Sequence, residues 1–346
     1  MIKALQETPL ANLASDRPLV TGNEKILILG ASGQIGKTLL PHFRKYYGQN
    51  LVLADVRESE GVIPFNMTDD GSVEKLIADH NVKVVINLVA PLSAEAQKRP
   101  DLANRIKDRS LDIIRNSEAL GLRLVFTASS IAIATKPKTE GELPWPIANL
   151  NNDSDPVGVY AAAKREIEEA TKDLNRQNGT AKACCLRYGG VLACSVPPSN
   201  GTTEQLDKLV IAAAEHFVLR EMGKPTQPYK PSIPFSKTDP SFLRFTMVDS
   251  RTVGRETFRY LHNLGTKETA GKESEYFMAE YSATLDDTYR VLRRLVPNFK
   301  IENDPAVHEE VKKEFASIWP KFVEMRPSKE DWGFRSEYSL KQSVAY

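Results

Sequence analysis

The chain has 346 residues, of which 41% are hydrophobic and 26% charged, as in ordinary globular proteins with a large core. Lys and Arg number 46 against 45 Asp and Glu, so the net charge of +1 gives no electrostatic case for a nucleic acid or an anionic membrane as the main partner. The cysteines, Cys184, Cys185 and Cys194, contain no CxxC pair, and the five histidines lack metal-ligand spacing. We therefore expect neither a disulfide framework nor a metal site.

The N-terminal segment lacks the continuous apolar run of a signal peptide. No stretch approaches the roughly 18 apolar residues that a membrane span requires. The sequence therefore predicts a cytoplasmic protein, in which residues 1–21 form an extension before the first strand.

Short apolar runs alternate with longer helical patterns along the first two thirds of the chain, which is typical of βαβ units and a parallel sheet. The expected strands are residues 25–29, 51–55, 83–88, 122–126 and 182–187. The expected helices are residues 34–47, a short one from about Ser72, 94–120 and 159–176. Because the strands are almost wholly apolar, helices should cover both faces of the sheet. The predicted fold class is α/β, with a Rossmann-like doubly wound parallel sheet.

Two polar segments interrupt this pattern, residues 142–156 and the proline-rich residues 223–241. After the second of them, a strand is expected at residues 243–248. Helices are expected at residues 250–263, 285–295 and 306–318. These elements predict a smaller lobe that covers the ligand crevice.

A glycine-rich turn, Gly30-Ala-Ser-Gly33-Gln-Ile-Gly36, follows the first expected strand and opens the first helix. Glycines let such a turn approach a pyrophosphate, and the helix N-terminus offers unpaired N–H groups to the anion. Asp55 ends the second strand, where a carboxylate binds the 2′-hydroxyl of a ribose and repels a 2′-phosphate. This order predicts NAD rather than NADP, although Arg57 nearby weakens the preference. The alternative is a glycine turn that serves helix packing alone.

Tyr160 and Lys164 form a YxxxK pair on an expected helix, where positions i and i+4 share one face. An ammonium beside a phenol of pKa ~10 stabilises the phenolate and lowers that pKa, which makes a proton acceptor. The same pattern often arises by chance from a packed Tyr and a solvated Lys. Thr127-Ala-Ser129-Ser130, however, ends the fourth expected strand at the carboxyl edge of the sheet, where ligands bind. Its hydroxyls would orient a substrate oxygen toward the tyrosine.

The glycine turn, acid, serine and YxxxK, in this order, resemble the extended short-chain dehydrogenase/reductase superfamily, or NAD-dependent epimerase/dehydratase family. Over about residues 25–340 the chain is similar to the threonine dehydrogenase branch of that family. The segments that carry this similarity are Ala90-Pro-Leu-Ser93, Ser129-Ser-Ile-Ala132, Leu186-Arg-Tyr-Gly-Gly190, Gly201-Thr-Thr203, Ser317-Ile-Trp-Pro320 and Asp331-Trp-Gly-Phe334. We therefore divide the chain into an NAD-binding Rossmann domain at residues 22–195 and a mainly substrate-binding lobe at 196–346, from which 242–264 return to the Rossmann sheet.

The resemblance implies a role for each site residue. As a tyrosinate, Tyr160 would take the proton of a substrate hydroxyl, Lys164 would lower its pKa and hold the ribose, and Ser130, beside Ser129, would bind the reacting oxygen. The implied contacts of NAD are Gly30, Ser32, Gly33, Gln34, Ile35, Gly36, Asp55, Val56, Leu88, Ala90, Thr127, Tyr160, Lys164 and Tyr188. Those of the substrate are Ser93, Ser129, Ser130, Tyr160, Gly201, Thr202 and Thr203.

The implied reaction is the NAD-dependent oxidation of a small β-hydroxy amino acid, with L-threonine giving 2-amino-3-oxobutanoate as the best single example. The resemblance also implies a homodimer, joined through apolar surfaces of residues 94–120 and 159–170. Two alternatives stay open: a nucleotide-sugar epimerase or dehydratase that recycles bound NAD, and a non-enzymatic dinucleotide-binding protein.

The chain departs from the family pattern at several places, among them an enlarged loop before Tyr160 that contains Trp145. Residues 107–109 stand where the family has an Asn that feeds a proton relay, Gly189 replaces a proline, and residues 133–135 replace an aromatic-glycine pair. Several of these changes border the expected substrate pocket. These changes concern the substrate side of the site and leave the cofactor motifs unchanged.

Overall fold

The computed structural model describes residues 9–91, 93–134, 148, 150, 156, 158–179, 182–192, 204–230, 244–264, 275–302, 320 and 322–345. Its centre is a seven-stranded sheet of order β3-β2-β1-β4-β5-β6-β9, and every neighbouring pair is parallel. The strands are β1 (Lys25–Leu29), β2 (Leu51–Asp55), β3 (Ile63–Pro64), β4 (Val82–Asn87), β5 (Leu124–Ser130), β6 (Ala183–Tyr188) and β9 (Glu275–Met278). The predicted α/β class with a doubly wound sheet is confirmed.

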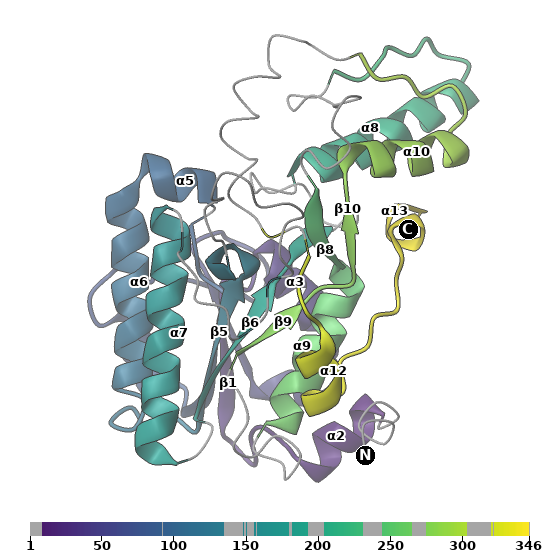
Figure 1. The fold of residues 1–346 in the computed structure, drawn as a ribbon. Coiled ribbons are helices and arrows are strands. Elements are labelled where there is room, and N and C mark those ends of the chain that lie inside the picture. The colour runs from purple at the N-terminus through teal and green to yellow at the C-terminus, as the bar shows by residue number, and fades with distance from the viewer. Residues whose placement is uncertain are drawn as a thin grey trace.

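Helices cover both faces of this sheet (Figure 1). Successive residues of a strand point to opposite faces, so Ile26 and Ile28 of β1 enter one core and Leu27 and Leu29 enter the other. The first core is closed by α3 (Gln34–Tyr47) and α9 (Ser250–Asn263), and the second by α4 (Ser72–Asp79), α6 (Pro100–Arg115) and α7 (Val159–Asn178). The continuous apolar strands are thus explained by burial on both sides.

A second, smaller sheet of order β10-β8-β7 supports the lobe at the top of Figure 1. Its strands are β7 (Gly190–Leu192), β8 (Phe245–Asp249) and β10 (Tyr281–Ala283), and its helices are α8 (Glu204–Glu221) and α10 (Leu285–Leu295). The lobe has its own apolar cluster, which includes Leu209, Phe245, Leu292 and Phe299.

The expectation that residues 242–264 return to the large sheet is therefore wrong for the strand in this region. β8 joins β7 and β10 in the small sheet and does not enter the large one, whose last strand is β9. The reason lies at Gly189, where the chain passes from β6 to β7: a Cβ there would stand 2.9 Å from the carbonyl oxygen of Thr246. Glycine lets β8 approach this junction closely. The helix that follows, α9, packs against α3 on the large sheet.

The helix expected at residues 94–120 is broken in two. α5 (Ser93–Lys98) ends before Arg99, and α6 begins at Pro100, which occupies the first turn. Proline disfavours helical backbone at the residue before it, and Arg99 has φ −134° and ψ 65°. The expected helices at 34–47, 250–263 and 285–295 are confirmed, whereas the one at 306–318 lies outside the described residues.

The remaining helices lie at the two ends of the chain and between strands. They are α2 (Leu10–Asp16), α12 (Arg326–Trp332), α13 (Leu340–Ala345) and the 3-10 turns η1 (Gly48–Asn50) and η2 (Ile131–Ala134). α2, within the expected N-terminal extension, packs against α9, and α13 packs against α10. Among the described helices, none is long and apolar enough to cross a membrane.

Candidate active site

A cavity of about 470 Å³ lies at the carboxyl edge of the large sheet. It borders the ends of β1 and β4, where the strand order reverses and where open α/β sheets bind ligands. The cavity brings together most of the residues expected at the site: Gly30, Gly33, Gln34, Ile35, Gly36, Asp55, Val56, Leu88, Ala90, Ser129, Tyr160 and Lys164. Segments far apart in the sequence therefore meet around one space.

The glycine turn, residues 30–36, forms a backbone cradle that has no room for a side chain at Gly30 or Gly36. Gly30 has φ +81°, and a Cβ on it would stand 3.2 Å from the carbonyl carbon of Leu88. A Cβ on Gly36 would stand 2.5 Å from the carbonyl oxygens of both Gly30 and Ala31. Since α3 begins at Gln34, its N-terminal turn faces the cavity as well. The close contacts show that the glycines let strand, turn and helix pack tightly. The helix N-terminus at the cavity supplies the partial positive charge that suits a pyrophosphate.

Asp55 closes the cradle at the end of β2. Its side chain is 4% exposed, and its two oxygens accept hydrogen bonds from the backbone N–H groups of Ser32 and Arg57, both at 2.9 Å. The Arg57 guanidinium is mostly exposed, with Nε 3.5 Å from Asp55 Oδ1. The Ser32 hydroxyl bonds that of Ser59 at 2.9 Å, and so ties the turn to the loop after β2. A carboxylate held in this way fits the ribose hydroxyls of NAD.

Tyr160 and Lys164 face β5 from the first two turns of α7. The side chain of Ser130 lies near Tyr160 and acts to lower its pKa, and the Ser130 hydroxyl accepts a 3.2 Å hydrogen bond from the backbone N–H of Ala132. Lys164 Nζ donates a 2.6 Å hydrogen bond to the carbonyl oxygen of Ala128 and lies 5.9 Å from the centroid of the Tyr160 ring. The chain thus places the phenol of Tyr160 and the amine of Lys164 at one edge of the cavity.

The charges of this set differ from the expectation. Burial raises the pKa of Tyr160 above its usual value, and the side chain of Ser130 acts in the opposite direction. Burial also lowers the pKa of Lys164 to about 8, against the effects of Cys185 and Glu168. The predicted lowering of the Tyr160 pKa by Lys164 is not found, because burial has the largest effect and raises this pKa.

The two serines at the end of β5 point in different directions, as alternate residues of a strand do. Ser129 donates a 2.6 Å hydrogen bond to Oε1 of the buried Glu168, whereas Ser130 lies near Tyr160. Thr127 and Tyr188 lie in the core, 1% and 3% exposed, and the Tyr188 phenol is hydrogen-bonded to Thr257 at 2.7 Å. The cavity lining includes Ser129 but not Thr127, Ser130 or Tyr188.

The expected substrate contacts Gly201, Thr202 and Thr203 lie outside the described residues, and Ser93 is described only as the first residue of α5. Sequence reasoning missed an apolar wall of the cavity formed by Phe65, Met67, Leu102 and Ile106. These residues come from the loop after β3 and from α6, so no local pattern joins them. Lys107 bonds Glu166 at 2.9 Å, and residues 107–109 do not line the cavity.

The sequence model of the NAD dependent epimerase/dehydratase family matches residues 26–230. The chain belongs to this family. It is an NAD-dependent oxidoreductase of the extended short-chain dehydrogenase type, and the cradle and Asp55 are the parts of this chain that fit NAD. Within the described residues, no group of three or more His, Cys, Asp and Glu side chains is placed to hold a metal ion.

Relatives of this chain match nearly its whole length. The mitochondrial L-threonine 3-dehydrogenase of Bos taurus is 22% identical over 96% of this chain and 84% of its own. An uncharacterized epimerase/dehydratase of Staphylococcus aureus is 24% identical over 92% of this chain and 93% of its own. The holo structure of a GalE-like L-threonine dehydrogenase from Cupriavidus necator has a TM-score of 0.78 and 27% identity, covering 93% of this chain and 97% of that one.

Proposed function

We propose that the protein oxidises the hydroxyl of a small β-hydroxy amino acid, with L-threonine as the leading candidate and 2-amino-3-oxobutanoate as its product. The observation that carries this proposal is that Tyr160 and Lys164, with the Lys164 Nζ 5.9 Å from the centroid of the Tyr160 ring, line the same cavity as the glycine turn and Asp55. The names of the similar proteins from Bos taurus and Cupriavidus necator support the choice of substrate.

In this proposal the residues of the chain bind the substrate and move its proton. Ser130 holds the reacting oxygen, and Tyr160, once ionised, accepts the hydroxyl proton as general base. NAD, when bound, supplies the acceptor for the hydride that leaves the same carbon. Lys164 is placed to hold the nicotinamide ribose, with its Nζ fixed by the carbonyl oxygen of Ala128. Ser93, Thr202 and Thr203 are the proposed contacts of the amino-acid carboxylate and amine.

The pKa of Tyr160 determines whether the oxidation rate rises or falls with pH. The base form is the phenolate, and burial raises the pKa of this residue above its usual value. The fraction of ionised Tyr160 therefore increases as the pH rises, and the oxidation rate should increase with it from neutral into alkaline pH. A rate that falls over this range would contradict the assignment of Tyr160 as the base.

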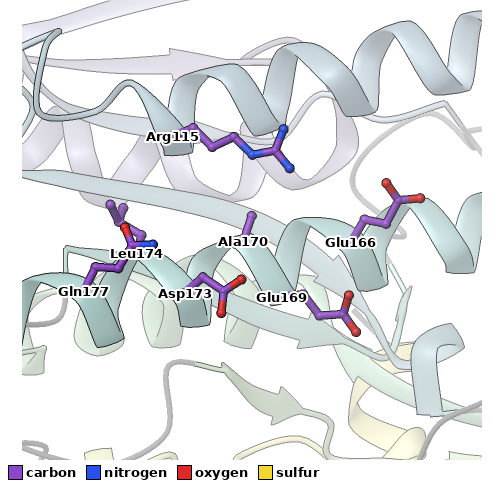
Figure 2. Close-up of a pocket in the computed structure, with 7 residues that line it drawn as sticks. All are labelled: Arg115, Glu166, Glu169, Ala170, Asp173, Leu174 and Gln177. Atoms are coloured by element: carbon purple, nitrogen blue, oxygen red, sulfur yellow. The ribbon is translucent and has the colours of Figure 1, made fainter.

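We propose further that two copies associate through α6 and α7. The surface expected there was apolar, but the groove between these helices, about 440 Å³, is lined mainly by polar and charged side chains (Figure 2). Its lining is Arg115, Glu166, Glu169, Ala170, Asp173, Leu174 and Gln177. A dimer formed on this face would have to pair these charges, so its dissociation constant should rise with salt concentration. Sedimentation at low and high salt measures this.

The experiment that tests the proposed reaction follows the absorbance of reduced NAD when purified protein, NAD and L-threonine are mixed at alkaline pH. Reduction in proportion to added L-threonine supports the proposal, and reduction with another hydroxy amino acid alone changes only the substrate. Conversion of a nucleotide sugar without net reduction of free NAD would instead show the epimerase class. Binding of NAD with no turnover of either would show a non-enzymatic protein.

A further inference from the structure

Behind the proposed catalytic residues lies a buried ion pair that the reaction itself does not use. Glu168 of α7 and Arg187 of β6 are 2% and 3% exposed. Arg187 donates to Glu168 Oε2 from Nη2 at 2.6 Å and from Nε at 3.1 Å, and to Oε1 from Nε at 3.0 Å. Taking two charges out of water is so costly that apolar residues of similar volume often stabilise a fold as well or better. A contribution to stability is therefore a weak explanation for the burial of these two charges.

The pair is hydrogen-bonded to β5, the strand that carries Ser130. Ser129 donates its hydroxyl to Glu168 at 2.6 Å and stands opposite Arg187 in the register of β5 and β6. One turn earlier on the same face of α7, Lys164 donates to the carbonyl of Ala128 at 2.6 Å. Two successive turns of α7 are thus bonded to two successive residues of β5. The next residue of that strand is Ser130, which lies near Tyr160.

The same pair sets the charge around Lys164. The ionisable groups that face Lys164 are Tyr160 and Glu168 on its own helix and Cys185 on β6. Burial raises the pKa of Cys185 far above its usual value, so it stays a neutral thiol. Arg187 neutralises Glu168, and Glu275 of β9, next to Cys185, is paired with Lys172. Loss of either Glu168 or Arg187 would leave one uncompensated charge beside the ammonium.

We propose that Glu168 and Arg187 form a positioning pair for the reaction. The pair fixes α7 on β5, so that Tyr160 meets Ser130, and it keeps the surroundings of Lys164 electrically balanced. Neither residue touches the cavity, and both act through Ser129 and Lys164. This inference rests on the role of Tyr160 as base in the proposed function.

The test compares Glu168→Gln with Arg187→Gln. Ionisation of Tyr160 is measured as tyrosinate absorbance against the same protein carrying Tyr160→Phe, without NAD or substrate. Glu168→Gln leaves a positive charge, which favours loss of a proton from the Tyr160 and Lys164 pair, so the midpoint should fall by about one pH unit. Arg187→Gln leaves a negative charge, so the midpoint should rise by about one pH unit. One folded variant is enough for the test, because the midpoint is expected to fall in Glu168→Gln and to rise in Arg187→Gln.

The matched control is Glu169→Gln, the same change one residue further along α7. It is titrated, like the other variants, at a salt concentration and protein dilution at which sedimentation shows single chains, so that the proposed α6–α7 contact does not bury it. Glu169 is 55% exposed, lies on the outer face of α7 (Figure 2) and pairs with Arg165 at 2.7 Å. Its midpoint should stay within about 0.2 pH units of the wild type, because solvent screens the charge. Arg187→Lys, which keeps the charge, should restore the midpoint that Arg187→Gln displaces.

Turnover supplies a second measurement. In the Glu168→Gln variant, kcat should fall by about 10- to 100-fold, since a small misplacement of reacting groups costs this much, while the dissociation constant of NAD stays within about threefold. Midpoints that do not move in the folded variants, or that move in the same direction, would overturn the proposal. Because the titration uses no substrate, it can support the positioning pair even if L-threonine proves to be the wrong substrate.

Discussion

The inner and outer faces of α7 carry similar side chains in opposite surroundings. On the inner face, Lys164 and Glu168 are 4% and 2% exposed, and every polar contact described for them is with a strand or a neighbouring buried charge. On the outer face, Glu169 and Asp173 are 55% and 60% exposed and line a surface groove (Figure 2). Glu168 is thus a buried carboxylate bonded to a serine and an arginine, whereas the next residue, Glu169, is a solvated charge. Spacing along the helix therefore determines which face a side chain occupies, and burial on that face determines whether its charge is paired or solvated.

The largest expected effect is on the inner face at Tyr160. Tyr160→Phe removes the phenolic oxygen that accepts the proton, and kcat should fall by at least about 100-fold. The dissociation constant of NAD should change by less than about threefold, because the cradle and Asp55 remain. Steady-state kinetics and calorimetry measure the two quantities. Tyr46→Phe on α3 is the matched control with unchanged kcat, and turnover that survives Tyr160→Phe would show that another group is the base.

The two faces should also differ in the stability they lend to the fold. Glu168→Ala leaves the guanidinium of Arg187 buried without its partner, so the free energy of unfolding should fall by about 3–5 kcal/mol. Glu169→Ala breaks only an exposed pair and should cost less than about 1 kcal/mol. Denaturant unfolding of the two variants measures the difference. Equal losses would mean that the inner pair is solvated in solution and that the two faces are not distinct.

A smaller effect is expected at the end of β2, where a buried charge, Asp55, and an exposed charge, Arg57, stand two residues apart. Asp55→Asn removes the negative charge that repels a 2′-phosphate, so the preference for NAD over NADP should fall by roughly tenfold, about 1.4 kcal/mol. Arg57→Gln should change the affinity for NAD by less than about threefold, since its guanidinium is 64% exposed. Titration calorimetry with both dinucleotides tests this, and an unchanged preference in Asp55→Asn would remove Asp55 from cofactor selection.

Much of the large sheet could be predicted from the sequence because its signals are local. β1, β2 and α3 occur at the expected residues, where an apolar run, a glycine turn and a helical period follow one another. The break between α5 and α6 was marked by Pro100, but the helical period on both sides concealed it. β9 was missed, because a strand of four residues carries little periodicity and its partner, β6, is distant in the sequence.

The site was predictable to the extent that its geometry is local. The spacing of Tyr160 and Lys164 correctly placed both on one face of a helix. Which of the two serines meets Tyr160 depends on the pleat of β5 and the position of α7 on it, and neither is visible in the sequence. Arg187 in an otherwise apolar strand was a signal for a buried ion pair, but its partner Glu168 is found only in the folded chain.

The most direct test of the proposed reaction follows a single hydrogen. L-Threonine carrying deuterium on the carbon that bears the hydroxyl is incubated with the protein and NAD, and the reduced cofactor is analysed by mass spectrometry. The account predicts one deuterium in each reduced cofactor, formed together with one 2-amino-3-oxobutanoate, and almost none with the Tyr160→Phe variant. Reduced cofactor without deuterium, or deuterated substrate returned unchanged in the presence of active protein, would contradict it.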